Sequence, residues 1–207
     1  MPSVVELEAL VAERRQSLGE AHADTLAAML DLAEALWGEG RLHAARQLEE
    51  AVVAGRRTLY GAAHPETLKA LGKLAVSIGQ QGDLAEARRL QEEVVAGMRA
   101  HHGAEARDTL RAVNNLAGTI AALGDAAAAH AMLRETIATL QRAFGEDDVD
   151  TLTSLGNLAA LLWQAGEREE ALELQEHVAG ALRRTRGGDP ATQAAEATLA
   201  AMLSELF

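Results

Sequence analysis

The sequence predicts an all-α fold, a solenoid in which antiparallel helix pairs stack one on the next. Three patterns carry this prediction, and each recurs every 42 residues along the 207-residue chain. Glycine recurs in two series, a Thr-Leu pair recurs once per period, and alanine recurs in two further columns. A period of this length, shared by separate columns, is the signature of a repeat protein. The glycines are Gly19, Gly61, Gly103, Gly145 and Gly187 in one series and Gly40, Gly82, Gly124 and Gly166 in the other.

Each period contains two predicted helices, as the second period illustrates. The first helix covers about residues 65–80, where apolar side chains fall at helical spacing. His64 is the expected cap residue, because the proline that follows suits the first helical position. Gly82 ends this helix, and Asp83 can cap a second one that runs to about residue 102.

The alanine columns predict that the two helices of a pair cross closely. We expect Ala75 and Ala87 to face each other, because a larger side chain there would cost roughly 1–3 kcal/mol. Neither helix of a pair can bury its apolar stripe alone, so successive pairs must stack.

We expect ten helices, no strand and a single solenoid over residues 1–207. Glu6 and Glu196 fall in columns that are otherwise apolar, as end helices exposed to solvent require, so we expect a self-contained solenoid. The apolar Leu206-Phe207 end leaves open an association between copies of the chain. The expected parts are a half-repeat helix over 1–18, full repeats over 19–60, 61–102, 103–144 and 145–186, and a half-repeat helix over 187–207.

Composition excludes several classes of function. The net charge is −12, which opposes binding to the phosphate backbone of nucleic acids. The sequence has no cysteine, so disulfides, zinc-thiolate sites and cysteine nucleophiles are excluded. The acidic first residues do not read as a signal peptide, and no stretch approaches the ~20 apolar residues that span a bilayer. We expect a cytoplasmic protein that binds neither nucleic acid nor membrane.

The sequence offers no convincing catalytic, metal or cofactor site. His22 and His64 lie one period apart at helix starts, where capping explains them better than chemistry. His101 and His102 are adjacent on a helix and point about 100° apart, so they cannot form an i, i+4 metal pair. The acidic run at 147–150 and the basic run at 183–186 lie at helix ends that favour their charges. We therefore expect no enzyme, no cofactor and no metal.

Three motifs stand out within the period: His64-Pro65-Glu66-Thr67-Leu68, Gly82-Asp83 followed by Ala87, and Asn114-Asn115-Leu116-Ala117. These motifs resemble the tetratricopeptide repeat (TPR), and the 42-residue period resembles its kinesin-light-chain-like branch. The large aromatic positions of the family are mostly Leu, Ile or Gln in this chain. The resemblance implies a right-handed TPR superhelix whose first helices line a concave groove, and it implies a role in protein binding.

The positions expected to face this groove suggest a peptide as guest. The first repeat has Leu30, Glu34 and Trp37 there, whereas later repeats have mostly small residues, including Gly72, Gly118 and Gly156. Lysine and arginine in the groove would attract a peptide that is acidic or has a free carboxylate. Asparagine amides can pair with a peptide backbone, as the resemblance also implies. The candidate peptide-binding residues are Lys69, Lys73, Arg111, Asn114, Asn115, Asn157, Trp37 and Trp163.

Alternatives remain open at each of these points. The tryptophans can equally pack between neighbouring repeats, and the asparagines can bridge adjacent repeats. The first functional hypothesis is a module that binds an extended peptide or a partner helix in the groove. The alternatives are a structural solenoid that self-associates as a homo-oligomer, or the sensor arm of a larger bacterial regulator.

Overall fold

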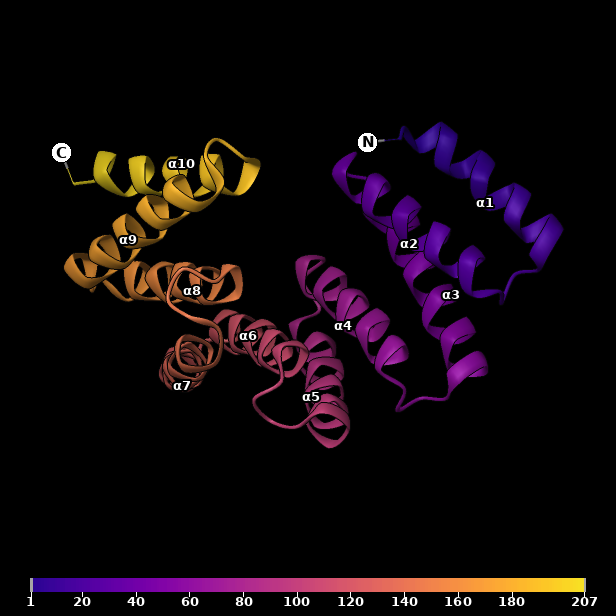
Figure 1. The fold of residues 1–207 in the computed structure, drawn as a ribbon, viewed down its shortest axis with the longest axis horizontal. Helices are drawn as coiled ribbons and strands as arrows, with labels where there is room; N and C mark the ends of the chain where they lie inside the picture. The colour runs from indigo at the N-terminus through magenta and orange to yellow at the C-terminus, as the bar shows by residue number, and fades with distance from the viewer. Residues whose placement is uncertain (1, 207) are drawn as a thin grey trace. The chain divides into compact units, whose positions relative to one another are not determined.

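A computed structural model describes residues 2–206, and this part of the chain contains ten α-helices and no strand (Figure 1). The expected all-α fold is therefore confirmed, and the helix ends fall where the glycines and cap residues place them. The chain divides into two compact units. Helices α1 to α5 form the first unit, and α6 to α10 form the second. The helices are α1 Val4–Leu18, α2 Ala23–Gly38, α3 Leu42–Tyr60, α4 Pro65–Gln80, α5 Leu84–His102, α6 Arg107–Ala122, α7 Ala126–Phe144, α8 Val149–Ala165, α9 Arg168–Arg186 and α10 Pro190–Ser204.

Within each unit, every helix packs against the next one along the chain. Figure 1 shows this order from α1 to α5 and again from α6 to α10. The alanine columns lie in the helix pairs: Ala75 of α4 and Ala87 of α5 are both 0% exposed. A Cβ atom added to Gly79, one turn after Ala75, would lie 3.3 Å from the Cβ of Ala87. The small residues therefore do allow a close crossing of α4 and α5.

The helix starts confirm the capping interpretation of the histidines. Nδ1 of His22 accepts a hydrogen bond from the backbone N–H of Asp24, and Nδ1 of His64 accepts one from Glu66, each at 3.2 Å. These bonds satisfy amides that the first helical turn leaves without an intrahelical partner.

The Thr and Gly columns have a common cause in the loop between repeats. The hydroxyl of Thr25 donates to the carbonyl oxygen of Gly19 at 2.8 Å, and Thr67 donates to Gly61 at the same distance. Both glycines have φ near +90°, which side chains other than glycine rarely adopt. Each repeat thus needs a glycine to turn the chain and a threonine to bond its carbonyl, six residues apart.

Glu6 of α1 and Glu196 of α10, which fall in otherwise apolar columns, both lie at the surface. Glu6 is exposed and forms a capping box with Ser3, while Val4, Leu7 and Val11 of α1 are buried. Glu196 pairs with Arg183 at 2.6 Å on α9. Leu206 is 40% exposed, whereas Phe207 lies outside the described residues, so association through this pair stays a prediction. Within residues 2–206, no helix is long and apolar enough to cross a membrane.

Candidate functional site

In the first unit, three of the α2 positions that we expect to face the groove line one hollow. Leu30, Glu34, Trp37 and Gly38 of α2 line it, together with Glu49 of α3 and Lys73 of α4, and its volume is about 370 Å³. This volume is within the range of small ligand pockets. Two candidate residues, Trp37 and Lys73, therefore lie on the same concavity.

The lysines of the first unit already have acidic partners. Nζ of Lys73 lies 3.4 Å from a carboxylate oxygen of Glu34, and Nζ of Lys69 lies 3.6 Å from one of Glu66. All four side chains are substantially exposed, so each pair contributes little, about 0–1 kcal/mol. The positive charge that the sequence assigns to the groove is thus locally balanced, but the partners can be exchanged at small cost.

Glu49 is a site residue that the sequence analysis missed. The residue is 7% exposed, and the hydroxyl of Ser77 donates to its Oε1 at 2.9 Å. Its Oε2 is buried and has no hydrogen-bond partner among the described residues. Burial raises the pKa of the Glu49 carboxyl, while the Ser77 hydrogen bond and the charge of Lys73 act in the opposite direction.

The repeat register contains a signal for Glu49. Residues at steps of 42 along the chain share its column, and these are Leu7, Gln91, Leu133 and Gln175. All four are buried, and Glu49 is the one acidic member of the column. An acidic residue in an otherwise neutral buried column marks a position that packing does not explain.

In the second unit, Arg111 belongs to an ion network rather than standing free in a groove. Its Nε lies 2.6 Å from Oδ1 of Asp150, and a second guanidinium, that of Arg107, pairs with both Asp148 and Asp150. Arg107 also lies over the ring of Phe144, at 4.1 Å from the centroid. The Arg107 guanidinium lowers the pKa of Asp148. The sequence analysis did not single out Arg107, because its partners are 41 and 43 residues away.

The three candidate asparagines differ in accessibility. Asn115 of α6 and Asn157 of α8 are exposed and can reach a ligand. Asn114 is 7% exposed, and its buried Oδ1 has no hydrogen-bond partner among the described residues. Asn115 and Asn157 are therefore the better candidates for backbone contacts with a peptide.

The Trp163 side chain is fixed by contacts with other residues of the second unit. Its Nε1 donates to a carboxylate oxygen of Glu205 at 3.1 Å, and the Arg168 guanidinium lies 5.0 Å from the ring centroid. These contacts tie the end of α8 to the start of α9 and to the residue after α10. Trp37, in contrast, lines a hollow.

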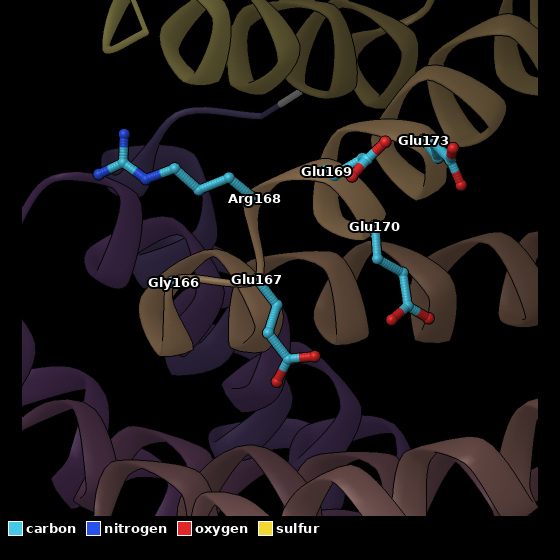
Figure 2. Close-up of a pocket in the computed structure, with 6 residues that line it drawn as sticks. All are labelled: Gly166, Glu167, Arg168, Glu169, Glu170 and Glu173. Atoms are coloured by element: carbon cyan, nitrogen blue, oxygen red, sulfur yellow. The ribbon is translucent and has the colours of Figure 1, made fainter.

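An acidic hollow of about 560 Å³ opens at the start of α9, lined by Gly166, Glu167, Arg168, Glu169, Glu170 and Glu173. Figure 2 shows Arg168 extending away from Glu169, Glu170 and Glu173. Glu170 is paired with Arg134, and the other charged side chains are exposed. No group of acidic or histidine residues in the described part of the chain is arranged to hold a metal ion. We interpret this hollow as the solvated start of a helix, where negative charge is favoured.

Two segments of the chain, residues 24–100 and 108–184, match the family model of the tetratricopeptide repeat. The chain belongs to the tetratricopeptide repeat family. The family resemblance inferred from the motifs is thereby confirmed. None of the curated proteins searched matches the chain.

Solved structures of TPR proteins support the kinesin-light-chain-like branch. Two crystal structures of kinesin-light-chain-type, nearly identical TPR-like repeats from Podosopora anserina are 30% identical to this chain and cover 88% of it. One of them, a point-substituted form, has a TM-score of 0.70 with 86% of its own chain covered, and the other has 0.67 with 87%. BtubC (BKLC) from P. vanneervenii has a TM-score of 0.76 at 19% identity, covering 98% of this chain and 82% of its own, which is a likeness of fold.

Proposed function

We propose that this TPR protein binds an extended peptide or a partner helix along the concave side of its first helices. TPR proteins generally mediate protein–protein interactions, and their fold is typically non-enzymatic. The observation that carries the proposal is the hollow that Leu30, Glu34, Trp37 and Lys73 line in the first unit, because we expect these positions to face the groove.

The second unit offers contacts of a different kind. Asn115 and Asn157 are exposed, and an amide can donate to and accept from a peptide backbone without reading its side chains. A Cβ atom added to Gly118 or Gly156 would meet nothing within 4 Å, so the helix surface is open there. Each such hydrogen bond contributes about 0.5–1.5 kcal/mol.

A preference for acidic peptides or a free carboxylate is the finer part of the proposal. A ligand carboxylate would replace Glu66, Glu34 or Asp150 as the partner of Lys69, Lys73 or Arg111. The Lys69 and Lys73 pairs are exposed and contribute only about 0–1 kcal/mol, so the exchange costs little there. Asp150 is largely buried and also pairs with Arg107, so the exchange at Arg111 costs more. Affinity from these contacts should fall as salt increases, since the groove is open to solvent. A cytoplasmic location and the absence of catalysis belong to the same proposal, whereas a place as the sensor arm of a larger bacterial regulator is an alternative to it.

The test is a displayed peptide library selected on the full chain, followed by calorimetry with the selected peptides. We expect a Lys69→Glu/Arg111→Glu variant to bind acidic peptides at least about tenfold more weakly. The matched control is Arg88→Glu/Arg142→Glu, which changes net charge equally but on the second helices α5 and α7. Equal affinity of both variants, with normal folding, would exclude the basic groove contacts.

Self-association is the competing proposal, and the exposed Leu203 and Leu206 near the end of α10 support it. Light scattering at several concentrations separates the two. A mass that rises with concentration and falls in a Leu203→Ser/Leu206→Ser variant would favour association between copies over peptide binding.

A further inference from the structure

Two adjoining hollows of the first unit have largely apolar linings, and the charged side chains among them are mostly acidic. The Trp37 hollow, defined above by Leu30, Glu34, Trp37, Gly38, Glu49 and Lys73, shares Glu34 and Gly38 with a hollow of about 490 Å³ between α1 and α2. This second hollow adds Asp31 and Glu39 to the lining. Among the described residues, Lys73 is the one basic side chain that lines either of them. The local charge therefore favours a cationic guest rather than an anionic one.

The buried carboxylate of Glu49 provides an observation independent of this acidic lining. Burying a charged group without a partner is costly, and Glu49 has one hydrogen bond, from Ser77, while its Oε2 has none among the described residues. Packing does not require the charge, because Gln91 and Gln175 fill the same column and are each 3% exposed. Lys73 does not supply the missing partner in this structure, since its ammonium group lies against Glu34.

We propose that the Trp37 hollow binds the basic side chain, Arg or Lys, of a partner peptide. The Glu49 carboxylate belongs to the lining and pairs with the bound cation when its buried Oε2 turns toward the hollow, and Glu34 supplies a second carboxylate at the exposed edge. Trp37 provides an aromatic wall, and the indole ring is the aromatic side chain that attracts cations best. This inference rests on the proposed function and adds one specificity element to it: a basic residue at the position that lies over α2 and α3.

Binding should be linked to proton release. Burial raises the pKa of Glu49, and the nearby Glu50 on α3 adds to this effect. The other groups near Glu49 are Ser77 and Lys73 on α4 and Glu34 and Trp37 on α2. A cation favours the ionised form, so affinity should increase as pH rises through the Glu49 pKa. Lys73 competes with the guest for the same carboxylates, so its removal should strengthen binding.

The direct test uses single amino-acid probes on the full chain at constant ionic strength. The readout is the Trp37 indole N–H resonance, assigned with a Trp163→Phe variant. We expect N-acetyl-arginine amide and N-acetyl-lysine amide to give saturable shifts, and N-acetyl-norleucine amide and N-acetyl-glutamate amide to give none. The matched variants are Glu49→Gln, which reproduces the residue of two other repeats, and Glu50→Gln, which removes the same charge on the exposed side of α3.

Glu49→Gln should lower the affinity for the arginine probe about tenfold or more, whereas Glu50→Gln should change this affinity less than about twofold. Lys73→Gln should raise the affinity severalfold. The inference is overturned if the basic probes give no saturable shift at Trp37, or if Glu49→Gln and Glu50→Gln bind them equally well.

Failure of the inference and failure of the proposed function are distinguishable by peptide selection on the wild type and on Glu49→Gln. Peptides that bind both proteins alike, without enrichment of Arg or Lys, would overturn the basic-side-chain site and leave peptide binding intact. Enrichment of Arg or Lys that disappears on Glu49→Gln would support the site. If the basic probes shift Trp37 but no peptide is selected, the site stands and the peptide-binding function is wrong.

Discussion

At the scale of single residues, Glu49 makes stability depend on pH. Its pKa is raised by burial, so the folded state holds the proton more tightly than the unfolded state does. The free energy of unfolding should therefore decrease as pH rises from the unfolded pKa through the folded one. Glu49→Gln should remove this decrease, so that the variant gains stability over the wild type as pH rises above the unfolded carboxyl pKa of about 4.3. Urea unfolding at a series of pH values measures the effect, and Glu50→Gln is the control that should keep most of the decrease.

The contribution of Asp148 to stability depends on pH in the opposite direction. The Arg107 guanidinium lowers its pKa, so its contribution to stability is present above the unfolded pKa and is lost as pH falls. Asp148→Asn keeps a side chain that can cap α8 but loses the ion pair, and should cost about 1 kcal/mol near neutral pH. The cost should shrink as the solution is acidified. Asp147→Asn, whose carboxylate is exposed beside Arg184, should change stability little at either pH.

At the scale of helices, substitutions at two glycines can distinguish an effect on stability from an effect on peptide binding. Gly118 lies on α6 where an added Cβ meets nothing within 4 Å, so Gly118→Ala should stabilise the helix by about 0.5–1 kcal/mol. If a peptide lies against this surface, the same methyl group should weaken its binding. Thermal unfolding and calorimetry with a selected peptide measure the two effects.

The control for this substitution is Gly97→Ala on α5. Its Cβ would lie 2.6 Å from a methyl carbon of Leu68, which is buried, so the gain in helix propensity should be offset by strain in the core. A Gly118→Ala variant that is stabilised and binds its peptide unchanged would argue against close approach of the ligand to α6.

The helix boundaries could be predicted from sequence because they depend on local chemistry. Gly61, Thr67 and His64 fix the turn and the cap through bonds between residues close along the chain. That Oε2 of Glu49 lacks a hydrogen-bond partner among the described residues could not be predicted in the same way, because this depends on how Ser77 and Lys73 of another helix are oriented. The network of Arg107 was missed for the same reason: partners about one repeat away become neighbours only after the helices pack.

Among the residues expected to face the groove, helical spacing predicted some placements and missed others. Leu30, Glu34 and Trp37 were assigned to one face from helical spacing alone, and they do line one hollow. Helical spacing could not show that Asn114 is buried while Asn115 is exposed, since that depends on the helices packed around α6. That all the basic residues and asparagines act as one binding track stays a prediction.

At the scale of the whole molecule, the question is whether the repeats unfold together. Leu74 of α4 and Leu158 of α8 occupy the same column, two periods apart, and are 6% and 2% exposed. Truncating either to alanine should cost about 2–5 kcal/mol, through lost burial and the cavity left behind. In a solenoid, stability is approximately a sum of repeat and nearest-neighbour terms, so the damage should remain largely local.

Hydrogen exchange along the chain distinguishes local from global unfolding with this matched pair. Leu74→Ala should accelerate exchange most in α3 to α5 and leave α8 and α9 better protected, whereas Leu158→Ala should show the reverse. The physical reason is that each helix packs mainly on its neighbours in sequence, so a cavity in one repeat weakens the adjoining interfaces first. If both variants accelerated exchange equally in all the described helices, the chain would be one cooperative unit, and the nearest-neighbour description of its stability would be wrong.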